Sequence, residues 1–115
     1  MQRVLVVDDD PDLRFLLRVA LDRRGESVVI AEASNGREAI DAARAHQPDV
    51  IILDEMMPVM TGMEALPELR SAAPNSRIVV YSAAASTEVG RRFADADGFL
   101  AKGGPLADLV DMIGG

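Results

Sequence analysis

The segment Val50–Leu53 is a run of four apolar residues, three of them β-branched, that ends abruptly at the carboxylate of Asp54. An apolar run without polar alternation is typical of a strand buried on both faces, as in a parallel sheet. The residues that follow, Met57–Pro58 and Thr61–Gly62, are typical of a loop. Asp54 is therefore expected where a buried strand leaves the core. In open α/β proteins this carboxyl edge of the sheet is where ligands bind.

Similar apolar runs alternate with amphipathic segments along the whole chain. The predicted strands are Val4–Val7, Val28–Ala31, Val50–Leu53, Ile78–Tyr81 and Gly98–Ala101. The predicted helices run from Pro11 to Gly25, from about Arg37 to Ala45 and from about Met63 to Ala73, with a weak helix around Val89 and Phe93 and a last one after Pro105. This alternation predicts an α/β fold, a doubly wound parallel sheet of five strands with helices on both faces.

Composition allows one domain and excludes several classes of function. The 115 residues suffice for a single domain, and the absence of cysteine excludes disulfides and thiolate chemistry. A net charge of −7 argues against nucleic-acid binding by this segment. No apolar run approaches the roughly 20 residues of a membrane span. The first strand follows Met1 so closely that no signal peptide is expected, and a cytoplasmic location is the expectation.

Polar residues follow four of the predicted strands: Asp8 and Asp9, Asp54, Ser82, and Lys102. Parallel strands place all of them at one edge of the sheet. Carboxylates brought together there would repel one another unless a cation intervened, and oxygen ligands suit Mg²⁺. A hydroxyl and the ammonium of the only lysine would stabilise the oxygens of a phosphoryl group. Asp54 would then be the nucleophile that forms an aspartyl phosphate.

Four motifs resemble the receiver domain of bacterial two-component response regulators. They are Val6-Val7-Asp8-Asp9, Leu53-Asp54-x-x-Met57-Pro58-x-x-x-Gly62, Tyr81-Ser82-Ala83 and Phe99-x-x-Lys102. They occur in order over essentially the whole chain. The resemblance therefore implies a single receiver domain over residues 1–115, stand-alone or cut before an output domain. It implies the flavodoxin-like receiver fold with strand order 2-1-3-4-5.

The resemblance implies that a histidine kinase or a phosphotransfer protein donates a phosphoryl group to Asp54. It implies Mg²⁺ bound by Asp8, Asp9, Asp54 and the backbone carbonyl of Met56. In this interpretation the protein is a signalling phosphoacceptor that assists its own phosphoryl transfer and autodephosphorylation, and is not an enzyme.

The resemblance also assigns a switch. Ser82 and Lys102 match the residues that contact the phosphoryl oxygens, and Phe99 matches the aromatic position that moves with Ser82. The surface formed by the fourth helix, fifth strand and fifth helix would carry the change to an output domain, a target protein or a second copy of the chain. Many relatives have proline directly after the lysine, whereas this chain has Gly103–Gly104. Lys-Gly forms occur in receivers with a LuxR-type DNA-binding domain, which points to a transcriptional output.

The first predicted helix has an inward stripe of Leu13, Leu16, Leu17, Ala20 and Leu21. Phe15 and Val19 form an apolar pair about 180° from this stripe. Since the helix borders the Asp8–Asp9 loop, where the resembling family docks its kinase, we expect Phe15 and Val19 to contribute to a partner surface.

Three other interpretations are open from the sequence. A phosphohydrolase resembling the haloacid dehalogenases would use Asp8 as nucleophile, because Asp8-Asp9-Asp10 has the Asp-x-Asp spacing, although Asp12 stands where Thr or Val is expected. A flavodoxin-like binding module would need a glycine- or Ser/Thr-rich phosphate loop after the first strand, which is absent. A degenerate receiver used only for protein contacts would not need the acidic residues and Lys102.

Overall fold

The computed structural model describes residues 1–83 and 95–114. Its five parallel strands form one sheet in the order β2-β1-β3-β4-β5, which confirms the predicted architecture. The strands are β1 (Gln2–Val7), β2 (Ser27–Ala33), β3 (Val50–Leu53), β4 (Arg77–Ser82) and β5 (Gly98–Ala101). The helices are α1 (Pro11–Arg24), α2 (Gly36–His46), α3 (Gly62–Ala72) and α5 (Leu106–Gly114). The weak helix predicted around Val89 and Phe93 lies outside the described residues.

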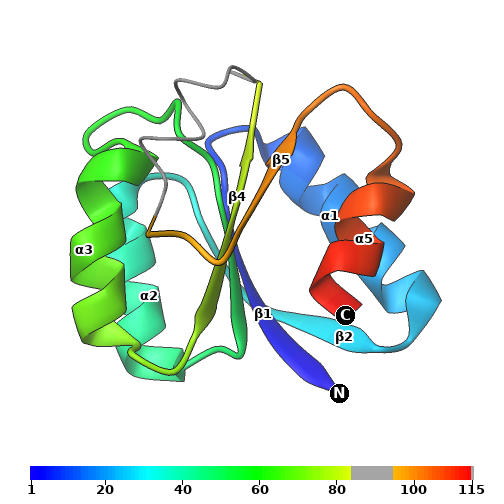
Figure 1. Ribbon diagram of the computed structural model, residues 1–115, viewed down its shortest axis with the longest axis horizontal. Coiled ribbons are helices and arrows are strands. Elements are labelled where there is room, and N and C mark those ends of the chain that lie inside the picture. The colour runs from blue at the N-terminus through cyan, green and yellow to red at the C-terminus, as the bar shows by residue number, and fades with distance from the viewer. Residues whose placement is uncertain (84–94, 115) are drawn as a thin grey trace.

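The sheet is the middle of three layers. Helices α1 and α5 lie on one face and α2 and α3 on the other (Figure 1). Successive residues of the central strands point into opposite cores, as the pleat of a strand requires. In β3, Ile51 and Leu53 belong to the core under α2 and α3, whereas Val50 and Ile52 belong to the core under α1 and α5. The unbroken apolar run of β3 is therefore explained by burial on both faces.

Local signals fix where α1 begins and ends. The side chain of Asp10 accepts a hydrogen bond from the backbone N–H of Asp12, and Pro11 occupies the first turn. Gly25 ends the helix with φ +77°, a left-handed conformation that favours glycine. Because α1 starts at Pro11, Asp8 and Asp9 lie in a short turn directly after β1.

Within the described residues, no helix has the length and apolar character that crossing a bilayer would require.

The inward stripe predicted for α1 was partly wrong. Leu17 and Leu21 are buried, and Leu13 and Ala20 pack against the same core, but Leu16 is 51% exposed. Leu16 directly precedes Leu17 and so points about 100° away from it around the helix, at the margin of the stripe, where it remains in solvent. Phe15 is 63% exposed and Val19 is 38% exposed, as predicted, so α1 carries a wider apolar surface than the pair alone.

Candidate functional site

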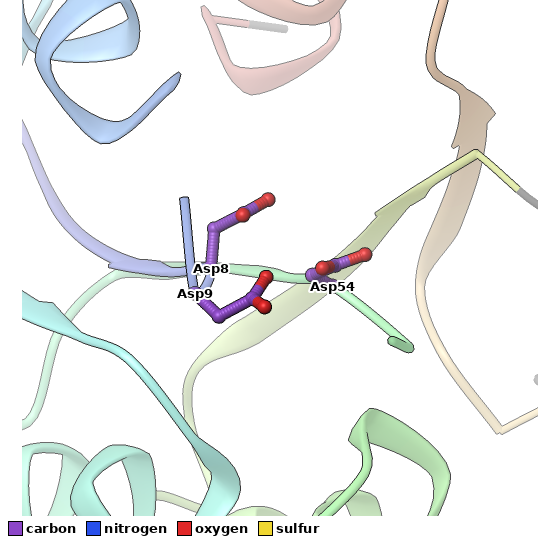
Figure 2. A group of neighbouring side chains, drawn as sticks. All are labelled: Asp8, Asp9 and Asp54. Carbon is purple, nitrogen blue, oxygen red and sulfur yellow. The ribbon is translucent and has the colours of Figure 1, made fainter. Parts of the chain in front are cut away.

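Strand register brings the predicted acidic residues together. Val7 of β1 is aligned with Leu53 of β3, so Asp8 and Asp54 leave the sheet side by side. The Asp54 N–H donates to the Val7 carbonyl at 3.0 Å, and the Asp8 N–H donates to the Ala33 carbonyl at 3.0 Å. Figure 2 shows Asp8 and Asp9 after β1 and Asp54 after β3, at the same edge.

The three carboxyl groups form a compact oxygen cluster. One carboxylate oxygen from each of Asp8, Asp9 and Asp54 lies within 4.8 Å of the other two. Asp8 and Asp54 are each 3% exposed, whereas Asp9 is exposed. Asp54 Oδ1 is buried, and among the described residues no group donates a hydrogen bond to it. A buried, unsatisfied carboxylate oxygen beside two other carboxylates fits a hard divalent cation such as Mg²⁺.

Lys102 reaches the cluster from the end of β5. Its ammonium Nζ donates to Asp8 Oδ2 at 2.7 Å and lies 3.4 Å from Asp54 Oδ1. The other oxygen of Asp8 accepts from the Asp10 N–H at 2.9 Å, so both oxygens of Asp8 are engaged. The Lys102 N–H donates to the Ser82 carbonyl at 2.8 Å, which fixes the lysine backbone beside β4.

The pKa values of the two central groups, Asp54 and Lys102, are both raised, but for different reasons. Burial and the neighbouring Asp8 carboxylate raise the pKa of Asp54 to about 6, against the opposing effects of Lys102 and the Met56 N–H. Burial alone would lower the pKa of Lys102, but its hydrogen bond to Asp8 and the charge of Asp54 raise that pKa overall. Lys102 is therefore charged at neutral pH, and Asp54, with its pKa raised to about 6, loses its proton around pH 6.

The raised pKa of Asp54 predicts a pH-dependent gain in stability for Asp54→Asn. From pH 3.8 to about 6 the folded carboxyl keeps a proton that the unfolded chain has lost, so stability falls as pH rises. Above pH 6 the buried carboxyl is ionised in the folded protein too, and the full loss of stability is present, at most roughly 3 kcal/mol. In urea unfolding with a chelator, the free energy of unfolding of Asp54→Asn should exceed that of the unmodified chain by about 2–3 kcal/mol at pH 7.5 and by little at pH 4. An equal gain at both pH values would contradict the raised pKa.

The loop after β3 approaches Asp54 closely through a glycine. A Cβ at Gly62 would lie 2.3 Å from the Asp54 carbonyl oxygen, and the Gly62 N–H donates to the Glu55 carbonyl at 3.1 Å. Thr61 and Glu64 cap the start of α3 reciprocally, which holds Gly62 in place. Met56, between these anchors, is 66% exposed. The predicted loop between β3 and α3 is confirmed.

The remaining predicted residues take the following positions. Ser82 is the last residue of β4 and is fully buried. Phe99 lies in β5, partly buried against the core under α2 and α3. Phe15 and Val19 are exposed on α1.

Two contacts at the site have no signal in the sequence. Arg14 of α1 donates from Nη1 to the Asp8 backbone carbonyl at 2.6 Å. Tyr81 lies beneath the lysine, with the Lys102 Nζ 5.8 Å from the centroid of its ring, within the range of a cation–π interaction. Both depend on side chains that cross between elements, which periodicity does not reveal.

Comparison with known proteins agrees with this geometry. The family model described as response regulator receiver domain matches residues 4–114. The nitrate/nitrite response regulator protein NarL of Escherichia coli is 38% identical over 112 residues, 96% of this chain and 52% of NarL. The chain thus spans about half the length of this curated relative.

Two solved structures are similar over nearly the whole chain. A LuxR-family two-component response regulator from Aurantimonas sp. superposes with a TM-score of 0.91 at 30% identity, covering 98% of this chain and 82% of that one. Response regulator TrrA from Thermotoga maritima, solved in complex with Mg²⁺ and BeF, has a TM-score of 0.87 at 30% identity, covering 98% and 96%. With the family model spanning the sheet, its helices and the acidic cluster, the chain belongs to the response regulator receiver domain family.

Proposed function

We propose that Asp54 accepts a phosphoryl group from the phosphohistidine of a histidine kinase or phosphotransfer protein. The observation that carries this proposal is the buried Oδ1 of Asp54, which lacks a hydrogen-bond donor among the described residues and lies 3.4 Å from the Lys102 ammonium. An Asp54 oxygen attacks phosphorus, the phosphorus–nitrogen bond of the donor breaks, and the imidazole leaves with the electron pair. The product is an acyl phosphate on Asp54.

Asp8, Asp9, Asp54 and the backbone carbonyl of Met56 would hold Mg²⁺ in this proposal. The oxygen cluster supports it, and TrrA, a similar protein, was solved with Mg²⁺ and BeF. When bound, the ion would offset the negative charge that the carboxylates and the phosphoryl oxygens share. The role of the chain is to preorganise these oxygens, which β1 and β3 do through their aligned ends.

Lys102 and Ser82 would stabilise the transferred group from the other side. The ammonium of Lys102 already lies between Asp8 and Asp54, and Ser82 ends the strand that pairs with β5. Movement of Ser82 toward the phosphoryl oxygens would let Phe99 turn further inward. The surface of β5 and α5 would change with it. The fourth helix of the predicted switch surface lies outside the described residues.

Partners follow from the same interpretation. Residues 1–115 act as one receiver domain whose exposed Phe15 and Val19 contribute to the kinase-docking surface. The output is a linked domain, a target protein or a second copy of the chain. Similarity to a LuxR-family regulator supports a transcriptional output.

The test uses Mg²⁺ with a small acyl phosphate donor, and beryllofluoride in parallel, on the unmodified chain and on Asp54→Ala. We expect one phosphoryl group per chain by intact mass, and a beryllofluoride-dependent change in the NMR signals of Phe99. Both should be absent in Asp54→Ala. Equal labelling of the variant would contradict the proposal.

A further inference from the structure

The Arg14 side chain binds the backbone of the turn after β1 that carries Asp8 and Asp9. From the second turn of α1, its guanidinium Nη1 donates to the Asp8 carbonyl at 2.6 Å. The Asp8 N–H is held from the opposite direction by the Ala33 carbonyl at 3.0 Å. Both backbone polar groups of Asp8 are therefore fixed, one by β2 and one by α1. The peptide that links Asp8 to Asp9 carries the carbonyl that Arg14 binds, so Arg14 also restrains the direction in which Asp9 leaves.

Arg14 is itself braced by an acidic residue on β2. Its Nε donates to Glu32 Oε1 at 3.0 Å, and Arg18 Nη2 donates to Glu32 Oε2 at 2.6 Å. These two arginines keep the pKa of Glu32 below its usual range, with the Arg18 hydrogen bond as the largest cause. The Arg14 side chain is only 18% exposed. A guanidinium can make both contacts at once because its donors form a rigid planar fork.

We propose that Arg14 is a positioning residue for the Asp8–Asp9 pair and thereby sets the affinity of the site for Mg²⁺. The proposal rests on the proposed function, since it takes the acidic cluster to be the metal site. Groups outside the ligand shell that orient metal ligands commonly change affinity by about 10- to 100-fold when removed. Arg14 would act in this way through the Asp8 carbonyl, without touching the ion.

Charge and positioning predict opposite effects for removal of Arg14. Loss of a positive charge near a carboxylate cluster would, by electrostatics alone, strengthen cation binding. A weaker affinity in a folded Arg14→Ala therefore cannot come from the lost charge and supports lost positioning. Arg18 supplies a matched control, because it pairs with the same Glu32 but its other contact is the Val29 carbonyl, away from the turn.

The experiment is a Mg²⁺ titration of the full chain by calorimetry, followed in parallel by the fluorescence of Tyr81, the only tyrosine in a chain without tryptophan. Arg14→Ala should weaken binding roughly tenfold. Arg18→Ala should match the unmodified chain or bind slightly more tightly. Arg14→Lys keeps the charge but lacks the rigid planar fork that contacts Asp8 and Glu32 together, so its Mg²⁺ affinity should fall several-fold. If Arg14→Ala does not fold, Arg14→Lys provides the test.

The outcomes separate the inference from the proposed function. If Arg14→Ala and Arg18→Ala both bind Mg²⁺ as tightly as the unmodified chain does, positioning by Arg14 is wrong and the proposed function stands. If the unmodified chain binds no Mg²⁺, the proposed metal site is wrong and the inference is overturned with it. Unfolding curves for Arg14→Ala and Arg18→Ala measure the effect on stability that the two variants share, the loss of an ion pair with Glu32.

Discussion

Gly62→Ala is expected to destabilise the protein by about 3 kcal/mol and to displace the acidic residue at the centre of the site. The new Cβ would meet the Asp54 carbonyl oxygen at 2.3 Å, the Asp54 carbonyl carbon at 3.0 Å and the Glu55 Cα at 3.1 Å. All three are backbone atoms, so no side-chain rotation relieves the clash. Either α3 or the peptide after Asp54 must move, and both changes disturb the proposed phosphoacceptor.

Thermal unfolding measures this effect, with a loss of about 10 °C expected for a domain of this size. Gly104→Ala is the matched control, since its Cβ would have only the Asp108 carboxylate within 4 Å, at 3.8 Å. That variant should unfold within a few degrees of the unmodified chain. A Gly62→Ala protein that was equally stable and equally phosphorylated would show that the loop does not press on Asp54.

Lys102→Ala is expected to slow phosphorylation by about 100-fold while strengthening Mg²⁺ binding. In the transfer step the chain would lose a positive charge that stabilises the phosphoryl oxygens, and loss of one such donor typically costs 10²- to 10³-fold. In the resting protein, however, the same ammonium occupies Asp8 Oδ2 at 2.7 Å. Its removal frees that oxygen and removes a competing charge, so the cation should bind more tightly.

Separate measurements test the two halves of this prediction. Calorimetry gives the Mg²⁺ affinity, and intact mass against time gives the phosphorylation rate at saturating Mg²⁺. Lys102→Arg serves as the control, because it keeps the charge and should leave Mg²⁺ affinity nearly unchanged. A Lys102→Ala protein that binds Mg²⁺ more weakly would mean that Lys102 supports the metal site and does not compete with it.

Much of the fold could be predicted because its strongest signals are local. The unbroken apolar run of β3 indicated burial on both faces, and Asp10, Pro11 and Gly25 marked the ends of α1. Strand ends were less predictable. The edge strand β2 extends to Ala33 and includes Glu32, a polar residue that accepts hydrogen bonds from Arg14 and Arg18 of α1.

The sequence predicted which residues lie at the candidate site, but not which of them contact one another. Parallel strands place Asp8, Asp54 and Lys102 at one edge, but the strand pattern alone did not indicate that they meet; only the resemblance to receiver domains implied it. The sequence did not indicate that Lys102 pairs more closely with Asp8 than with Asp54, because side-chain reach decides that. It placed Leu16 inward, because periodicity does not show how far a neighbouring helix covers a stripe. Arg14 was missed because its role depends on a contact across the β1–α1 turn.

The central claim is that Asp54, and not Asp8, carries the phosphoryl group. The most direct test is to label the chain with Mg²⁺ and a small acyl phosphate donor, reduce the acyl phosphate with borohydride, and locate the resulting homoserine by peptide mass spectrometry. We predict homoserine at position 54 alone, and none in Asp54→Asn. Homoserine at position 8 would contradict the account and favour a phosphohydrolase that uses Asp8 as its nucleophile.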